Sequence, residues 1–167
     1  MWPDAEAVGH LAALGSALAS PGSRPIRPAA LHLTLAFVGA VSAEDLARLR
    51  EVAAGVRTDG FDMRLDRLGF WPQHGVLWAG CEESPSGLRR LSQALMAALV
   101  DAGFAVARRG KAPVPHVTLA RRSRCHGLPR LESPVSWPVR EFALVESHLH
   151  PSAASYRTLA TFPLGQG

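Results

Sequence analysis

The chain has few of the residues that would place it in several common classes of protein. It holds two cysteines in 167 residues, Cys81 and Cys125, far apart and outside any Cys-x-x-Cys pattern. This usage argues against a disulfide framework, so we expect two free thiols. No stretch approaches the roughly 20 apolar residues of a membrane span. The opening residues have neither the basic flank nor the apolar core of a signal peptide, so we expect a cytoplasmic protein with no membrane partner.

Lysine is also scarce, since Lys111 is the only one. The net charge of +4 and the isoelectric point of about 10.0 therefore come almost entirely from arginine. A basic balance suits an anionic partner such as RNA, although a GC-rich genome also favours arginine and alanine. The apolar fraction of 47% and the charged fraction of 19% are typical of a globular protein. The length favours one domain spanning residues 1–167.

Apolar periodicity and turn residues predict an α+β fold in two similar halves. Three helices are expected, over 4–19, 42–56 and from Ser84 to Gly103. Strands are expected over 31–39, 61–65, 75–81, 115–121, 140–149 and 155–162. The strand 75–81 is expected to pair with 61–65, and the last two strands to join at Pro151-Ser152.

One short motif occurs twice, as "LHLTLAF" at 31–37 and "PHVTLAR" at 115–121. Random placement would give about 0.2 copies of His-x-Thr in such a chain, so the repetition is significant. Side chains alternate between the two faces of a strand. His32 and Thr34 therefore share one face, and His116 and Thr118 share another. If the halves face each other, two imidazoles and two hydroxyls meet in one cleft.

That group of side chains suits phosphoryl chemistry. A neutral imidazole can take a proton from water while a protonated imidazole opposite gives one to the leaving oxygen. Two hydroxyls can donate hydrogen bonds to phosphate oxygens between them. A 2′,3′-cyclic phosphate is ring-strained and has a sugar oxygen as its leaving group, so no metal or other cofactor is needed.

The sequence resembles the two-histidine phosphoesterases, and among them the bacterial RNA 2′,3′-cyclic phosphodiesterases, also called 2′-5′ RNA ligases. The two quoted motifs carry the resemblance, which continues through "LDRLGFWPQHGVLWAG" and "SYRTLATFPL". It implies two pseudo-symmetric lobes, each an antiparallel sheet with helices outside, whose His-x-Thr strands line a central cleft. Members of the family usually begin with a further strand before the first helix. This chain opens with Met1-Trp2-Pro3, so we expect that strand to be missing here, at a cost to stability and activity.

The resemblance also implies an activity and roles for individual residues. The expected reaction is hydrolysis of a terminal 2′,3′-cyclic phosphate of RNA or of a nucleotide to a 2′-phosphate, with reversible 2′-5′ ligation in some members. His32 would give the proton and His116 would accept one, although the two roles could be exchanged. Thr34 and Thr118 would hold the phosphate of the substrate. The protein is expected to act as a monomer. Strict alternation points Arg121 away from His116, so it reaches the phosphate only if the strand ends or twists there.

Two other functions compete with this one. His148 and His150 have the spacing of metal ligands on one strand face, which would suit a metal-dependent hydrolase, but no carboxylate follows them closely. An RNA-end binding protein could keep the cleft without turnover. The remaining histidines, His10, His74 and His126, are expected to be solvated. The basic residues around the second motif form either a solvated face or a guide for an RNA end: Arg108, Arg109, Lys111, Arg121, Arg122 and Arg124.

Overall fold

The computed structural model describes residues 1–106, 114–125, 127–148 and 155–165, and it shows the expected α+β fold with three α-helices. The helices are α1 (Ala5–Ala17), α2 (Ala43–Gly55) and α3 (Ser86–Asp101). The Asp4 carboxylate caps α1 by accepting from the amide of Ala7, and the Ser42 hydroxyl caps α2 in the same way. Gly103, with a φ of 81°, ends α3 in the left-handed conformation that glycine adopts without strain.

The strands of the described residues form three antiparallel sheets. A four-stranded sheet has the order β1-β5-β4-β3, and two further sheets pair β2 with β6 and β7 with β8. The strand bounds are β1 (Arg24–Pro25), β2 (Phe61–Leu65), β3 (Arg67–Trp71), β4 (Val76–Gly80), β5 (His116–Arg121), β6 (Val135–Val139), β7 (Glu141–His148) and β8 (Ser155–Pro163). Two short 3₁₀ turns complete the description. The turn η1 (Pro28–Ala30) precedes the first motif, and η2 (Pro72–His74) joins β3 to β4.

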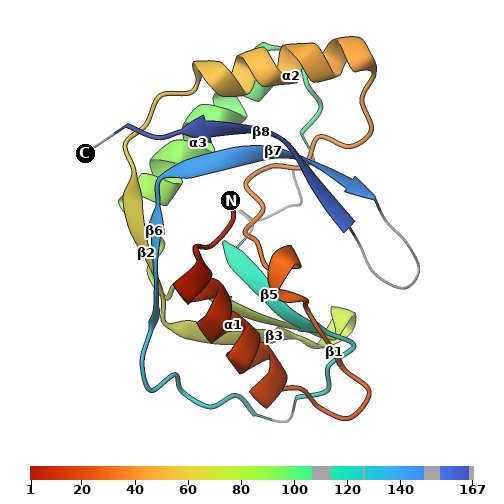
Figure 1. Ribbon diagram of the computed structural model, residues 1–167, viewed down its shortest axis with the longest axis vertical. Coiled ribbons are helices and arrows are strands. Elements are labelled where there is room, and N and C mark those ends of the chain that lie inside the picture. The colour runs from red at the N-terminus through yellow and green to blue at the C-terminus, as the bar shows by residue number, and fades with distance from the viewer. Residues whose placement is uncertain (107–113, 126, 149–154, 166–167) are drawn as a thin grey trace.

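The elements gather into two lobes. Figure 1 shows the four-stranded sheet with α1 in one lobe, and the β7–β8 hairpin with α2 and α3 in the other. The pair β2–β6 runs along one side, where α1 contacts β6 and α3 contacts β2. In α1, Gly15 lies against β5 so closely that a Cβ there would be 2.9 Å from the carbonyl oxygen of Leu119. This close packing fixes α1 on the strand that carries the second motif.

Two expectations about the strands are wrong. Residues 31–39 form no strand among the described residues; only Leu33 makes an isolated bridge, to Val117. Alternation predicts which face is buried, but a strand also needs a neighbouring backbone to pair with. The expected hairpin between 61–65 and 75–81 is also absent, because β4 pairs with β3 and β5 while β2 pairs with β6. The expected turn at Pro151-Ser152 lies outside the described residues.

Candidate active site

The two His-x-Thr motifs pair with each other at their central residues. Leu33 and Val117 form an antiparallel bridge, and both side chains are buried. The residues on either side of this bridge therefore point to the opposite face, where His32 lies across from Thr118 and Thr34 lies across from His116. One pair of neighbouring backbones thus brings all four predicted side chains together. The motifs lie edge to edge in this arrangement.

Each imidazole is held in the same way. His32 Nδ1 lies 2.7 Å from the carbonyl oxygen of Ala30, and His116 Nδ1 lies 2.8 Å from that of Val114. A carbonyl oxygen can only accept a hydrogen bond, so Nδ1 carries a proton in both rings. The Nε2 atom is then the position that gains or loses a proton during a reaction.

The surroundings lower the pKa of both imidazoles, so each ring binds a proton less readily than a free histidine does. Burial lowers the pKa of His32 and of His116 below the ordinary value of 6.5, against the opposing effect of the Nδ1 hydrogen bonds. The positive charge of Arg121 lowers the pKa of both, and a charge on His116 lowers that of His32. The three groups therefore share one electrostatic environment. An anion bound among them would raise both pKa values and be attracted by all three.

A β-bulge turns Arg121 toward this face. Two consecutive residues of β4 lie opposite Thr118 and Ala120, which leaves Leu119 as one extra residue in β5. Leu119 and Ala120 are both buried, and Arg121 is exposed on the side of the sheet that also carries His116. Strict alternation would have placed Arg121 on the far side, and the extra residue reverses that.

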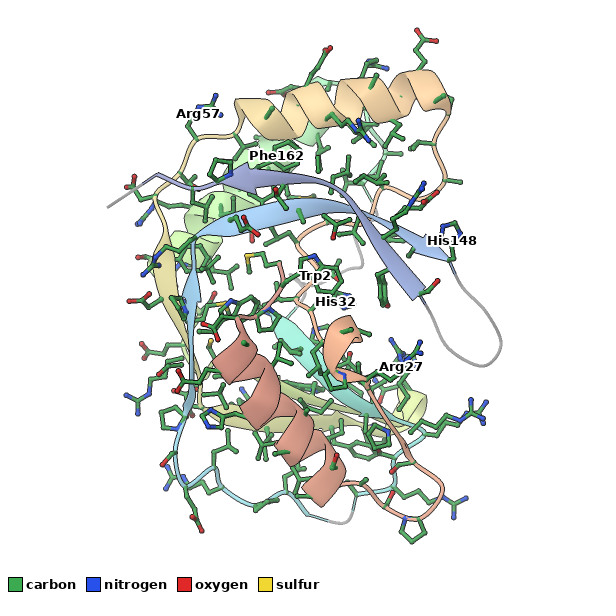
Figure 2. The ribbon with its side chains drawn as sticks, in the orientation of Figure 1. Trp2, Arg27, His32, Arg57, His148 and Phe162 are labelled. Atoms are coloured by element: carbon green, nitrogen blue, oxygen red, sulfur yellow. The ribbon has the colours of Figure 1, made fainter. Side chains whose placement is uncertain are left out.

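Aromatic rings surround both imidazoles, and sequence reasoning missed them. Trp2 and Tyr156 lie edge-on to His32, with ring centroids 5.4 Å and 4.6 Å away. Figure 2 shows Trp2 and His32 side by side between the two lobes. On the other side, Trp71 lies 4.5 Å from His116. These rings cover part of each imidazole, and burial is the main cause that lowers both histidine pKa values. A concentration of aromatics in the two family-like segments was the available signal.

The ring beside His116 rests on a second one. Trp78 packs against Trp71 at 5.3 Å and is itself 4% exposed. Its indole lies flat over Gly69 of β3, where an added Cβ would be 1.9 Å from a ring atom. Gly69 weakens the local strand signal but leaves room for this indole. The packing of Trp78 on Gly69 thus supports the Trp71 ring, which in turn contacts His116.

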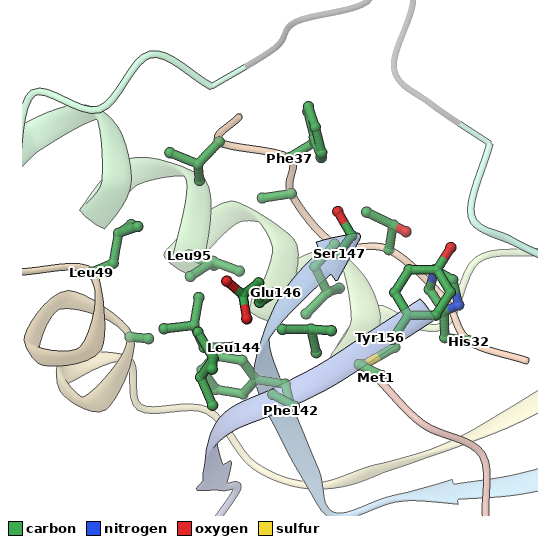
Figure 3. A pocket seen from close by; sticks show the side chains of 18 of the residues that line it. Met1, His32, Phe37, Leu49, Leu95, Phe142, Leu144, Glu146, Ser147 and Tyr156 are labelled. Atoms are coloured by element: carbon green, nitrogen blue, oxygen red, sulfur yellow. The ribbon is translucent and has the colours of Figure 1, made fainter. Parts of the chain in front are cut away.

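A groove of about 670 Å³ extends from His32 into the other lobe. Figure 3 shows His32 and Tyr156 at one end and apolar side chains such as Phe142 and Leu95 deeper in. At its edge Met1 exchanges two backbone hydrogen bonds with Leu33, and burial of the Met1 amino group lowers its pKa to about 5. The groove places an apolar surface directly beside the polar cleft.

Of the candidates for a metal site, His148 lines the groove that begins at His32, and His150 lies outside the described part of the chain. His148 is exposed, and its Nε2 is 3.1 Å from the Glu146 carboxylate, which also binds Arg157. Among the described residues no group of three His, Cys, Asp or Glu side chains could hold a metal ion. The residues left undescribed are His126, His150, Arg108, Arg109 and Lys111.

The two cysteines are free thiols, as expected, and both are half-buried. Burial raises the pKa of Cys81, which makes its thiolate scarce at neutral pH. No helix in the described ranges is long and apolar enough to cross a membrane.

Comparisons with known proteins agree with this geometry. A model of the 2′-5′ RNA ligase superfamily matches residues 3–151. An RNA 2′,3′-cyclic phosphodiesterase of Escherichia coli is 35% identical over 145 residues, covering 86% of this chain and 81% of that protein. One from Thermus thermophilus is 33% identical over 157 residues, covering 86% and 76%. The crystal structure of E. coli LigT complexed with 3′-AMP superposes with a TM-score of 0.87 at 32% identity, covering 98% of this chain and 94% of that one.

Proposed function

This chain belongs to the 2′-5′ RNA ligase superfamily, and from that premise we propose that it is an RNA 2′,3′-cyclic phosphodiesterase. Its substrate is an RNA end or a nucleotide that carries a 2′,3′-cyclic phosphate. The observation that carries the proposal is the antiparallel bridge between Leu33 and Val117, because it brings two imidazoles and two hydroxyls to one face. Curated relatives with this activity are 30–35% identical to the chain.

In the proposed step, water attacks the phosphorus and the bond to the 3′ oxygen breaks. His116 Nε2 takes a proton from the water, and His32 Nε2 gives one to the 3′ oxygen, so that a 2′-phosphate remains. Thr34 and Thr118 donate hydrogen bonds to the non-bridging oxygens, and Arg121 neutralises their charge. Protons and charge balance without a metal, because one imidazole is charged before the step and the other after it.

The same bond changes accommodate ligation. If the hydroxyl of another RNA end replaces water, the product is a 2′-5′ phosphodiester, and the reaction can run backward through the same two imidazoles. This is the activity that the superfamily description names.

We further infer that residues 1–167 act as one two-lobed domain and as a cytoplasmic monomer. The bridge between residues 33 and 117 supports the first inference because each motif completes the other's site. All five proposed site residues come from one chain, so the site needs no second copy. The two free thiols suit a reducing compartment.

The direct test is incubation with 2′,3′-cyclic AMP, and with a short RNA that ends in a cyclic phosphate, with and without EDTA. The proposal expects a 2′-phosphate product in both conditions. Loss of activity with EDTA and its return with zinc or manganese would favour a metal site at His148 and His150. Binding of the cyclic end without any product would favour the non-catalytic alternative.

A further inference from the structure

A second arginine lies beside Arg121 on the cleft side of the sheet. Arg24 of β1 is the direct cross-strand partner of Arg121 in an antiparallel pair, and both residues are exposed. Side chains of directly opposed residues lie on the same face about 5 Å apart at Cβ. The bulge that turns Arg121 toward the cleft therefore places Arg24 there as well. Strand β1 is held against β5 by a further hydrogen bond, from the amide of Ile26 to the carbonyl oxygen of Leu119.

Two like charges directly opposite each other are unfavourable in a sheet unless something neutralises them. Among the described residues, the ion pairs include neither Arg24 nor Arg121. Residues 7–43, 67–81 and 102–131 contain no aspartate or glutamate. These three ranges include both motifs and all of β1, β4 and β5, as well as β3. The pair of arginines thus lies on a stretch of sheet without acidic residues, and Glu146, which lines the groove beside His32, is engaged by Arg157 and His148.

The pair lies to one side of the position where the cyclic phosphate binds. Thr118 and Arg121 are three residues apart along β5, or about 7–10 Å at a strand's rise per residue when the bulge is allowed for. The long side chain of Arg121 can carry its guanidinium over part of that distance toward the cleft. Arg24 lies level with Arg121 along β5, on the edge of β5 that Leu33 also bridges, so both arginines stand at about this distance from the reacting phosphate. A phosphate one nucleotide away falls within their reach.

We propose that Arg24, together with Arg121, binds the RNA phosphate on the 5′ side of the terminal nucleotide. An RNA end carries this phosphate and a nucleoside cyclic phosphate lacks it. The inference rests on the proposed function, because it takes the cyclic phosphate to be bound by Thr34 and Thr118. It makes Arg24 a residue that selects RNA ends over mononucleotides.

The test compares two substrates: a dinucleotide that ends in a 2′,3′-cyclic phosphate and the matching nucleoside 2′,3′-cyclic phosphate. The preference is the kcat/KM of the dinucleotide divided by that of the mononucleotide. For Arg24→Gln we expect this ratio to fall about tenfold, because one contact with a charged phosphate is lost. In a plot of log kcat/KM against log salt concentration for the dinucleotide, the slope should decrease in magnitude by about one. Arg24→Lys should restore part of the ratio.

Arg50→Gln is the matched control, because it removes the same charge from an exposed position on α2, in the lobe far from β1 (Figure 1). It should leave the substrate ratio unchanged. Since Arg24→Gln relieves a repulsion, its melting temperature should not fall below that of the native chain, which separates lost binding from lost folding.

An unchanged ratio in Arg24→Gln, or an equal loss with both substrates, would overturn the proposal. So would a native enzyme with no preference for the dinucleotide. Failure of the proposed function gives a different result, because the native chain would then turn over neither substrate.

Discussion

Replacing the two threonines tests how the cleft holds a phosphate. Valine has nearly the shape of threonine, and Thr34 is exposed while Thr118 is half-buried, so Thr→Val removes a hydroxyl with little change in packing. Each hydroxyl that donates to a charged oxygen contributes roughly 1.5–3 kcal/mol. Thr34→Val and Thr118→Val should therefore each lower kcat/KM by about 10- to 150-fold. Thr→Ser keeps the hydroxyl and should recover most of the loss.

The assay is steady-state hydrolysis of a nucleoside 2′,3′-cyclic phosphate between pH 4 and 9. A hydroxyl that only donates a hydrogen bond moves no proton, so the shape of the pH profile should survive in Thr→Val. Thermal unfolding of each variant checks that the fold is intact. If Thr→Val changes a limb of the profile, or if Thr→Ser is as impaired as Thr→Val, the threonines are not simple phosphate donors.

Two further changes test the electrostatics and the packing around the site. Arg121→Gln removes a charge that lowers the pKa of both histidines, so the bell-shaped profile of kcat/KM should move to higher pH, and a shift to lower pH would refute the assigned electrostatics. Gly69→Ala puts a Cβ inside the ring of Trp78, so it should lower both kcat and stability, the latter by about 1–3 kcal/mol. Gly9→Ala on α1, where a Cβ meets nothing within 4 Å, is the control and should stabilise the protein slightly. If Gly69→Ala behaves like this control, the packing of Trp78 on Gly69 does not support Trp71 beside His116.

The direction of the histidine pKa shifts has a further consequence for pH dependence. Both imidazoles have pKa values below 6.5, so the free enzyme should work best on the acid side of that value. A bound anionic phosphate raises both pKa values, so the profile of kcat should lie at higher pH than that of kcat/KM. Their proton affinity also affects stability. The unfolded chain binds more protons as the pH falls below about 6.5, so the free energy of unfolding should decrease there.

The repeated motif was sufficient to predict that His32, Thr34, His116 and Thr118 meet on one face, because the alternation of side chains on either side of Leu33 and Val117 is a local property. Helix bounds were also predictable, since the caps at Asp4 and Ser42 and the break at Gly103 depend on neighbouring residues only. Pairing across long stretches of chain was not. The partner of β2 is β6, about 75 residues away, and no local pattern indicates it.

The position of Arg121 shows the same limit on a smaller scale. A single extra residue at Leu119 reverses the face on which the arginine lies, and the sequence "HVTLAR" contains no glycine or other mark of a bulge. Two tertiary contacts meet at the extra residue: the amide of Ile26 donates to the Leu119 carbonyl, and Gly15 packs closely against the same carbonyl. Aromatic neighbours such as Tyr156 reach His32 from a segment more than 100 residues away for the same reason.

Turnover of a nucleoside 2′,3′-cyclic phosphate by His32→Ala, His116→Ala and the double variant shows whether both imidazoles take part in the reaction. Each single change should lower kcat by about 10²–10⁴, the usual contribution of a positioned acid or base. The double variant should be little worse than the poorer single variant, because the two imidazoles act as one unit. Each single variant should also lose one limb of the pH profile. A near-native rate in either single variant would contradict the claim that these two histidines perform the reaction.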